Sequence, residues 1–196
     1  YINDGKGSFN RSDKLSKMLG NTKAVVSFDY DGDGDMDYFV GNLGGNNKFH
    51  PTKDKPLHIY GNNFDDDGNY DMILSKLYNG NLVPVRGKEC STSQNPFVSE
   101  KIKTYKEFAN SSLADIYGSE VLEASYHKEA QGFESVFIEN KGNGTFEVKH
   151  LPSVAQFGPT MSFVFMDING DGHLDVLGSG ACAAPSPILS ARVDPR

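Results

Sequence analysis

Three short segments of this chain carry oxygen-bearing side chains at one shared spacing. In residues 29–37, 63–71 and 167–175, an aspartate or asparagine stands at positions one, three, five and nine, and glycine stands at position six. Oxygens at alternate positions of a tightly curled loop can aim at a single point, and a hard divalent cation takes six to eight oxygen ligands at about 2.3 to 2.6 Å. The pattern therefore predicts three calcium sites.

Position seven is where the loops differ most in chemistry. A calcium loop can use the backbone carbonyl of that residue as a ligand, so the side chain there is free to vary. Glycine at position six permits the sharp turn that brings the other ligands together. The candidate metal-binding residues, at positions one, three, five, seven and nine, are Asp29, Asp31, Asp33, Asp35, Asp37, Asn63, Asp65, Asp67, Asn69, Asp71, Asp167, Asn169, Asp171, His173 and Asp175.

Calcium fits this donor set better than magnesium or zinc. Magnesium prefers strict octahedral geometry and keeps its waters. Zinc is disfavoured by the lack of nearby Cys and clustered His, since His173 alone cannot make a zinc site. Without a cation, two carboxylates 4 Å apart repel by about 1 kcal/mol even in water. We therefore expect about three calcium ions, with the weakest site in loop 63–71, where Asn63 replaces an aspartate at position one.

Two other interpretations compete with a calcium loop of this kind. A single Asp- and Gly-rich segment can be a solvated turn, but three copies at one spacing favour metal binding. An EF-hand loop ends in a bidentate glutamate at position twelve, between two helices. Position twelve here is Val40, Leu74 or Gly178, which excludes the EF-hand.

Strands are predicted to hold the loops in place. Each loop lies between short runs rich in β-branched and aromatic residues, which favour strands. These runs are residues 25–28 and 38–40, 57–60 and 72–74, and 163–166 and 176–177.

An internal repeat links the loops to hairpins. The segment Tyr1–Phe9 is echoed, with one extra residue, by Phe137–Phe146, and each copy reads as an apolar pair, an Asn/Asp/Gly turn and an aromatic residue. This order predicts a β-hairpin. An acidic loop follows about 20 residues after each aromatic residue, so hairpin and loop recur as one unit.

One segment departs from the strand pattern. Apolar residues recur three and four positions apart from Val98 to Phe108, which predicts a helical stripe, and Ser112 with Asp115 resembles a capping box. We expect a helical insertion over about residues 96–128, its aromatic residues packing it onto the sheets.

Composition limits the remaining choices. The 196 residues are 37% hydrophobic, enough for a core, and the formal net charge of −7 disfavours binding to nucleic acid. No apolar run is long enough to span a membrane, at about 18 residues. Cys90 and Cys182 fit neither a disulfide-dense scaffold nor a zinc spacing, and whether they pair is left open. Residues 181–196 show no periodicity and predict a disordered or unrelated tail.

The loops, the hairpins and the stretch Gly41–Phe49 together resemble the FG-GAP and VCBS repeats, a family that includes the propellers of integrin α chains and cartilage-acidic-protein-like bacterial proteins. The resemblance covers most of residues 1–180. It implies an all-β fold, a calcium-bearing β-propeller of FG-GAP/VCBS blades with the helical segment inserted, and metal ligands at positions one, three, five and nine. A propeller needs at least four blades of about 40 to 50 residues, so we expect a partial propeller from a longer chain.

The family likeness implies a non-catalytic binding or adhesion module, secreted or at a cell surface and associated with an outer membrane in the bacterial branch. Its expected partner is a protein or a carbohydrate, with calcium in a structural role. A spacer domain in a larger surface protein is a further possibility that the sequence does not separate from adhesion.

The alternative is the propeller part of a secreted polysaccharide lyase or hydrolase. Such an enzyme needs a convergent set of Tyr, His, Lys or Arg near the metal. The candidates have ordinary interpretations too, as a surface ion pair for Arg86 with Glu89 and as a polar exit from the helical insertion for the other three. The candidate residues are Arg86, Glu89, Tyr126, His127 and Lys128.

Overall fold

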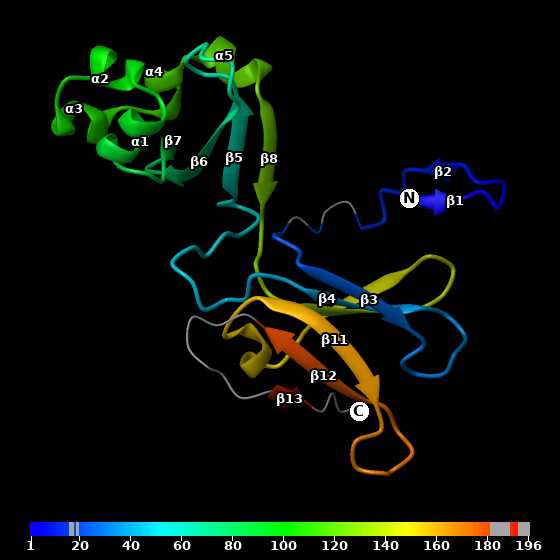
Figure 1. Cartoon of the computed structure of the whole chain (residues 1–196). Coiled ribbons are helices and arrows are strands. Elements are labelled where there is room, and N and C mark those ends of the chain that lie inside the picture. Colours follow the sequence, from blue (N-terminus) through cyan, green and yellow to red (C-terminus); the bar gives the residue numbers. More distant parts are fainter. Residues whose placement is uncertain (16–17, 19, 181–188, 192–196) are drawn as a thin grey trace. The chain divides into compact units, whose positions relative to one another are not determined.

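The computed structural model, drawn in Figure 1, describes residues 1–15, 18, 20–180 and 189–191. The chain divides into two compact units. Unit 1 combines Tyr1–His50 with Gly132–Arg196, and unit 2 is Pro51–Gln131, so unit 2 is inserted into unit 1 in sequence. Antiparallel sheets dominate both units, in agreement with the expected all-β class, and within the described residues they do not close into a propeller.

The described residues of unit 1 form three sheets. One is the hairpin β1–β2, one has four strands in the order β10-β9-β4-β3, and one has three in the order β11-β12-β13. The strands are β1 (Ile2–Asn3), β2 (Phe9–Asn10), β3 (Ala24–Phe28), β4 (Asp37–Gly41), β9 (Val136–Asn140), β10 (Phe146–His150), β11 (Thr160–Met166), β12 (Asp175–Gly180) and β13 (Leu189–Ala191), and a short 3-10 helix, η1, covers Ser153–Gln156.

The predicted hairpins are present and have the same register. Asn3 pairs with Phe9 in one, and Asn140 pairs with Phe146 in the other. Each pair encloses five residues, so the one extra residue seen in the sequence lies within strand β9, before the turn, and not in the turn itself.

Aromatic side chains fill the core of unit 1. Phe39 in β4 is fully buried, and its ring lies 4.7 Å from Phe137 and 5.2 Å from Phe165 by ring centroids. The cluster includes rings from strands β3, β4, β9 and β11. Strand β4 pairs with β9, although all of unit 2 lies between these two strands in the sequence. Its aromatic members are Phe28, Tyr30, Phe39, Phe137, Phe163 and Phe165.

The stretch after β4 joins the two halves of unit 1. Asn42 donates its backbone N–H to Ser135 Oγ at 3.0 Å and accepts from the backbone N–H of Asn21 at 2.9 Å. Gly41 lies so close to Thr160 that an added Cβ would come within 2.2 Å of that residue's carbonyl oxygen. Only glycine fits at that position.

Unit 2 contains one sheet, in the order β7-β6-β5-β8, and five short helices. The strands are β5 (Leu57–Asn62), β6 (Asp71–Tyr78), β7 (Asn81–Pro84) and β8 (Tyr126–Ala130). The helices are α1 (Lys88–Gln94), α2 (Phe97–Lys101), α3 (Tyr105–Asn110), α4 (Leu113–Tyr117) and α5 (Ser119–Ala124), and they gather beside the sheet (Figure 1).

The helical segment differs from its expected bounds of about 96–128. It begins eight residues earlier, at Lys88. The sequence did not reveal α1 because this helix buries only Ser91 and so has no apolar stripe. It ends at Ala124, and Tyr126–Lys128 belong to the edge strand β8, so these residues are not a polar exit from a helix.

The core of unit 2 lies between the helices and one face of the sheet. Val98, Ile102 and Phe108 are buried, as the stripe predicts, together with Ile73 of the sheet. Tyr105 is exposed instead, because α2 ends at Lys101 and α3 starts a new helix axis at Tyr105. The predicted capping box is present at the start of α4, where Ser112 and Asp115 exchange hydrogen bonds.

Part of the predicted tail 181–196 pairs with the sheet of unit 1, because Leu189–Ala191 forms β13 next to β12. Residues 181–188 and 192–196 lie outside the described residues, so the expectation for them stays a prediction. Among the residues that are described, no helix has the length and apolar character needed to cross a membrane.

Candidate metal-binding loops

The three acidic loops all connect strands, as predicted. Loop 1 (29–37) joins β3 to β4, loop 2 (63–71) joins β5 to β6, and loop 3 (167–175) joins β11 to β12. The residues at position twelve, Val40, Leu74 and Gly178, all lie within strands. The helix that would follow an EF-hand loop is therefore replaced by a strand in each case.

The loops share one backbone conformation. Positions four and six have positive φ in all three, a region that glycine enters without steric cost. Five of the six residues are glycine, and the exception is Asp66 at position four of loop 2. The values are 77° and 92° at Gly32 and Gly34, 59° and 89° at Asp66 and Gly68, and 77° and 84° at Gly170 and Gly172.

A recurring hydrogen bond closes each loop. The carboxylate at position nine accepts from the backbone N–H at position two, seven residues earlier. The N···O distances are 2.9 Å from Tyr30 to Asp37, 3.3 Å from Phe64 to Asp71 and 3.0 Å from Ile168 to Asp175. This bond brings the ligand at position nine close to the first residues of the same loop.

Shorter hydrogen bonds curl the middle of each loop. The side chain at position three accepts from the backbone N–H at position five, and the side chain at position five accepts from position seven. In loop 2 the amide of Asn69 also donates to Asp67 Oδ2 at 2.9 Å, and this bond is the main cause that lowers the pKa of Asp67. The three loops therefore have the same internal order as well as the same spacing.

Position one distinguishes loop 2 from the others. Asp29 accepts from the backbone N–H groups of Gly32 at 2.8 Å and Gly34 at 3.0 Å. Asp167 accepts equivalent bonds from Gly170 and Gly172. Asn63 Oδ1 is buried and has no hydrogen-bond partner among the described residues, which leaves an oxygen that a cation would satisfy.

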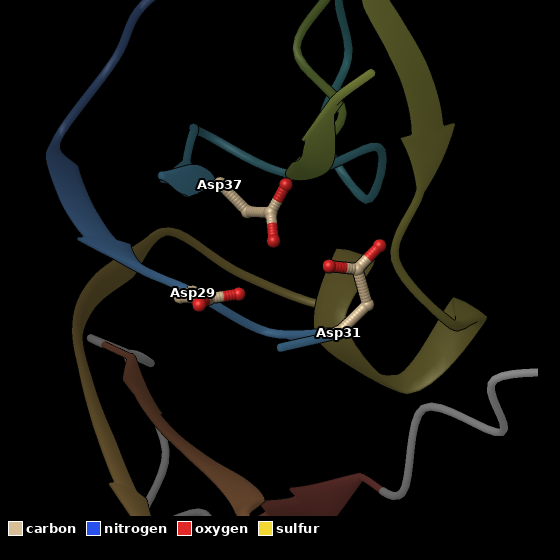
Figure 2. Close-up of side chains that lie close together, drawn as sticks. All are labelled: Asp29, Asp31 and Asp37. Carbon is tan, nitrogen blue, oxygen red and sulfur yellow. The ribbon is translucent and has the colours of Figure 1, made fainter. Parts of the chain in front are cut away.

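Loop 1 brings its carboxylates closest together. One carboxylate oxygen each from Asp29, Asp31 and Asp37 lie within 4.8 Å of one another, and Figure 2 shows the three side chains around a common space. Asp37 is fully buried, and its second oxygen accepts from the backbone N–H of Asn140 at 2.8 Å. Asp33 and Asp35 belong to the same loop but stand outside this group.

The other two loops do not form such a group of acidic side chains in the described part of the chain. Every predicted donor in them is a carboxylate, an amide oxygen or a backbone carbonyl, except the side chain of His173, which is exposed. Oxygen donors of this kind suit a hard cation such as calcium. The chemistry of all three loops thus fits calcium, and the geometry of loop 1 fits it best.

The residues considered for catalysis do not converge. Tyr126 and Lys128 alternate with His127 along β8, so they lie on the opposite face of the strand. The expected ion pair of Arg86 with Glu89 is not formed among the described residues. Arg86 donates to Gln94 Oε1 at 3.4 Å, and Glu89 accepts from the Tyr105 hydroxyl at 2.5 Å.

A histidine pair in unit 2 escaped the sequence analysis. His58 Nδ1 and His127 Nε2 lie 3.0 Å apart, and Tyr60 stacks on His127 with ring centroids 4.4 Å apart. The register of β5 against β8, which places Tyr60 opposite His127 and His58 opposite Glu129, brings these side chains onto one face. A long-range strand pairing of this kind leaves no local sequence signal.

We expect unit 2 to lose stability as the pH falls below about 6.5, the ordinary pKa of histidine. Burial, followed by the nearby His127, lowers the pKa of His58, and Glu129 opposes this shift. Near these pH values the folded state thus binds fewer protons at His58 than the unfolded state does. The stability that unit 2 gains from keeping His58 neutral is therefore fully present above about pH 6.5, and it is lost as the pH falls to the lowered pKa of His58 in the folded state. Thermal melting between pH 7.5 and 5.5 measures the loss.

His58→Phe is the matched variant, because it keeps a buried ring and cannot titrate. Its melting temperature should change less over this pH range than that of the unmodified chain. Equal pH dependence in both proteins would assign the effect to other groups.

Of the two cysteines, Cys90 is an exposed free thiol in α1, and Cys182 lies outside the described residues.

A family model described as an FG-GAP-like repeat matches residues 120–178. The matched segment includes β8 to β11 and the whole of loop 3, and loops 1 and 2 lie before it. The match supports the FG-GAP/VCBS repeat family and does not reach the finer assignment to a branch of it. Neither the curated proteins nor the solved structures gave a match to the chain.

Proposed function

We propose that this chain is a non-catalytic binding module, outside the cell or at its surface, whose three acidic loops hold structural calcium ions. The observation that carries the proposal is that the three loops share the same spacing and the same local structure. Spacing, the sign of φ at positions four and six, and the bond from position two to position nine recur in all three. Solvated turns have no reason to share so many features.

Bound calcium would supply positive charge at the points where the carboxylates converge. In loop 1, Asp29, Asp31 and Asp37 already lie close together and would be ligands from the side chains, with Asp33 at position five and the backbone carbonyl at position seven as further predicted donors. Three ions carry six positive charges, so the formal charge would change from −7 to −7 + 6 = −1. Self-repulsion that opposes the compact state would largely disappear.

The binding role rests on the repeat family and on the strand-and-loop architecture. FG-GAP repeats suggest adhesion-type modules that act outside the cell, and connecting loops on a rigid sheet scaffold are the usual place for recognition. We propose a protein or carbohydrate partner, a propeller completed by further blades of a longer chain, and a bacterial surface or outer membrane as its location. Extracellular modules can bind calcium at about 10⁻⁴ to 10⁻³ M and remain loaded there.

Calcium titration tests the proposal. Isothermal calorimetry should find about three ions per chain, and the melting temperature should be higher in calcium than in chelator, because a ligand that binds only the folded state stabilises it. At a calcium concentration 100 times the dissociation constant, each site would add about 2.7 kcal/mol.

The matched control is Asp29→Asn with Asp31→Asn, which keeps the shape of loop 1 and removes two of its charges. This variant should bind one ion fewer. Absence of binding to the unmodified chain, or melting that is indifferent to chelator, would mean that the loops are solvated turns.

A further inference from the structure

We propose that the ion in loop 2 controls the order of helices α1–α5, so that calcium regulates the helical surface of unit 2. This inference rests on the calcium binding proposed above and adds a regulatory role for one of the three sites. The argument comes from three contacts that tie loop 2 to the helices, all within unit 2.

The first contact joins the position-nine ligand to α1. Gln94, the last residue of α1, donates its side-chain amide to Asp71 Oδ1 at 3.3 Å and to the carbonyl of Met72 at 3.2 Å. Gln94 Oε1 in turn accepts from Arg86 at 3.4 Å, just before the helix begins. A cation that fixes the carboxylate of Asp71 therefore fixes the acceptor that holds the end of α1.

The second contact places position two of the loop in the helical core. The ring of Phe64 packs against Tyr117 of α4 with centroids 5.2 Å apart, and Phe97 of α2 meets Tyr117 edge-on at 5.9 Å. Burial raises the pKa of Tyr117 to about 12, which agrees with its place in this core. Because the backbone of Phe64 also donates to Asp71, closure of the loop sets the position of this ring.

The third contact joins the start of the loop to α5. Asn62 donates its side-chain amide to Ser125 Oγ at 3.2 Å, and Ser125 Oγ donates to the carbonyl of Val121 in α5. Asn62 Oδ1 accepts from the backbone N–H of Asn63, the position-one residue. Asn63 Oδ1, which has no hydrogen-bond partner in the described part of the chain, belongs to the residue next to this link, so an ion bound to that oxygen would act at both ends of the helical segment.

The helices are short enough to depend on such contacts. They have five to seven residues each, whereas isolated helices shorter than about 12–15 residues are marginal in water. In chelator, repulsion among Asp65, Asp67 and Asp71 would loosen the loop and with it three supports of the helices. Loop 1 differs, because the second oxygen of Asp37 is held by Asn140 in a strand of unit 1.

Hydrogen exchange followed by mass spectrometry of the full chain tests the inference. In calcium, amides in residues 88–124 should exchange more slowly than in chelator, by up to about 100-fold at a calcium concentration 100 times the dissociation constant of the site. Asp65→Asn with Asp67→Asn in loop 2 should abolish this slowing. The matched change in loop 1, Asp29→Asn with Asp31→Asn, should leave it intact.

The variant Gln94→Ala keeps every predicted ligand and removes one link. It should bind the same number of ions as the unmodified chain and show a smaller effect of calcium on α1. A full effect in this variant would overturn the role of Gln94.

The outcomes separate the two proposals. If the loop 2 variant binds one ion fewer, but calcium leaves exchange in 88–124 of the unmodified chain unchanged, the regulatory inference fails and the structural calcium sites stand. If calorimetry detects no calcium binding at all, both fail.

Discussion

Replacing Asp37 with alanine is expected to lower the free energy of unfolding of unit 1 by about 2–4 kcal/mol even without calcium. Asp37 is fully buried and accepts from the backbone N–H groups of Tyr30 and Asn140. Hydrogen bonds to a charged group are worth about 1.5–3 kcal/mol each, and their loss leaves two donors unpaired. Removing a carboxylate also relieves repulsion by Asp29 and Asp31, which offsets part of this loss.

The measurement is chemical denaturation in chelator followed by circular dichroism, with hydrogen exchange to assign the transition to unit 1. Asp33→Ala is the matched control, because Asp33 lies in the same loop but is exposed. In chelator this variant should change the unfolding free energy by less than about 0.5 kcal/mol. Equal effects of the two substitutions would show that Asp37 does not hold loop 1 to β9.

Calcium should increase the difference in melting temperature between Asp37→Ala and the unmodified chain. The variant loses a ligand as well as two hydrogen bonds, so added calcium should raise its melting temperature less. Asp37→Asn keeps one acceptor oxygen and should fall between the two.

The parts of this fold that could be predicted are those with local signals. The strands beside each loop follow from β-branched and aromatic runs, and the start of α4 follows from Ser112 and Asp115, because each depends on neighbours only a few residues away. The candidate metal site was predictable for the same reason. The ligands of each loop lie within nine consecutive residues, and the backbone that curls them is encoded by its glycines.

The parts that escaped prediction depend on contacts distant in sequence or on polar burial. Helix α1 is a run of mainly polar residues whose buried member is Ser91, so no hydrophobic period marks it. The pairing of β4 with β9 joins Phe39 to Phe137 across an inserted unit, and no short window of sequence contains both strands. The pair His58 and His127 depends in the same way on β5 meeting β8.

Phe39→Ala is expected to have the largest effect of any single substitution in unit 1, a loss of about 3–5 kcal/mol. The side chain has no exposed surface, and five rings lie around it with centroids 4.7 to 6.2 Å away: Phe28, Tyr30, Phe137, Phe163 and Phe165. Truncation removes apolar area from the core and leaves a cavity. The surrounding rings belong to different strands and to loop 1, so they cannot all move inward to fill it.

Val25→Ala is the control for Phe39→Ala, because Val25 lies in the same sheet and is 58% exposed. It should cost less than about 0.5 kcal/mol, since surface substitutions of this kind change little. Denaturation of both variants in saturating calcium keeps the loops equally loaded and isolates packing. A cost near 1 kcal/mol for Phe39→Ala would mean that the aromatic cluster collapses easily around the gap, and that the loops, more than the core, hold unit 1 together.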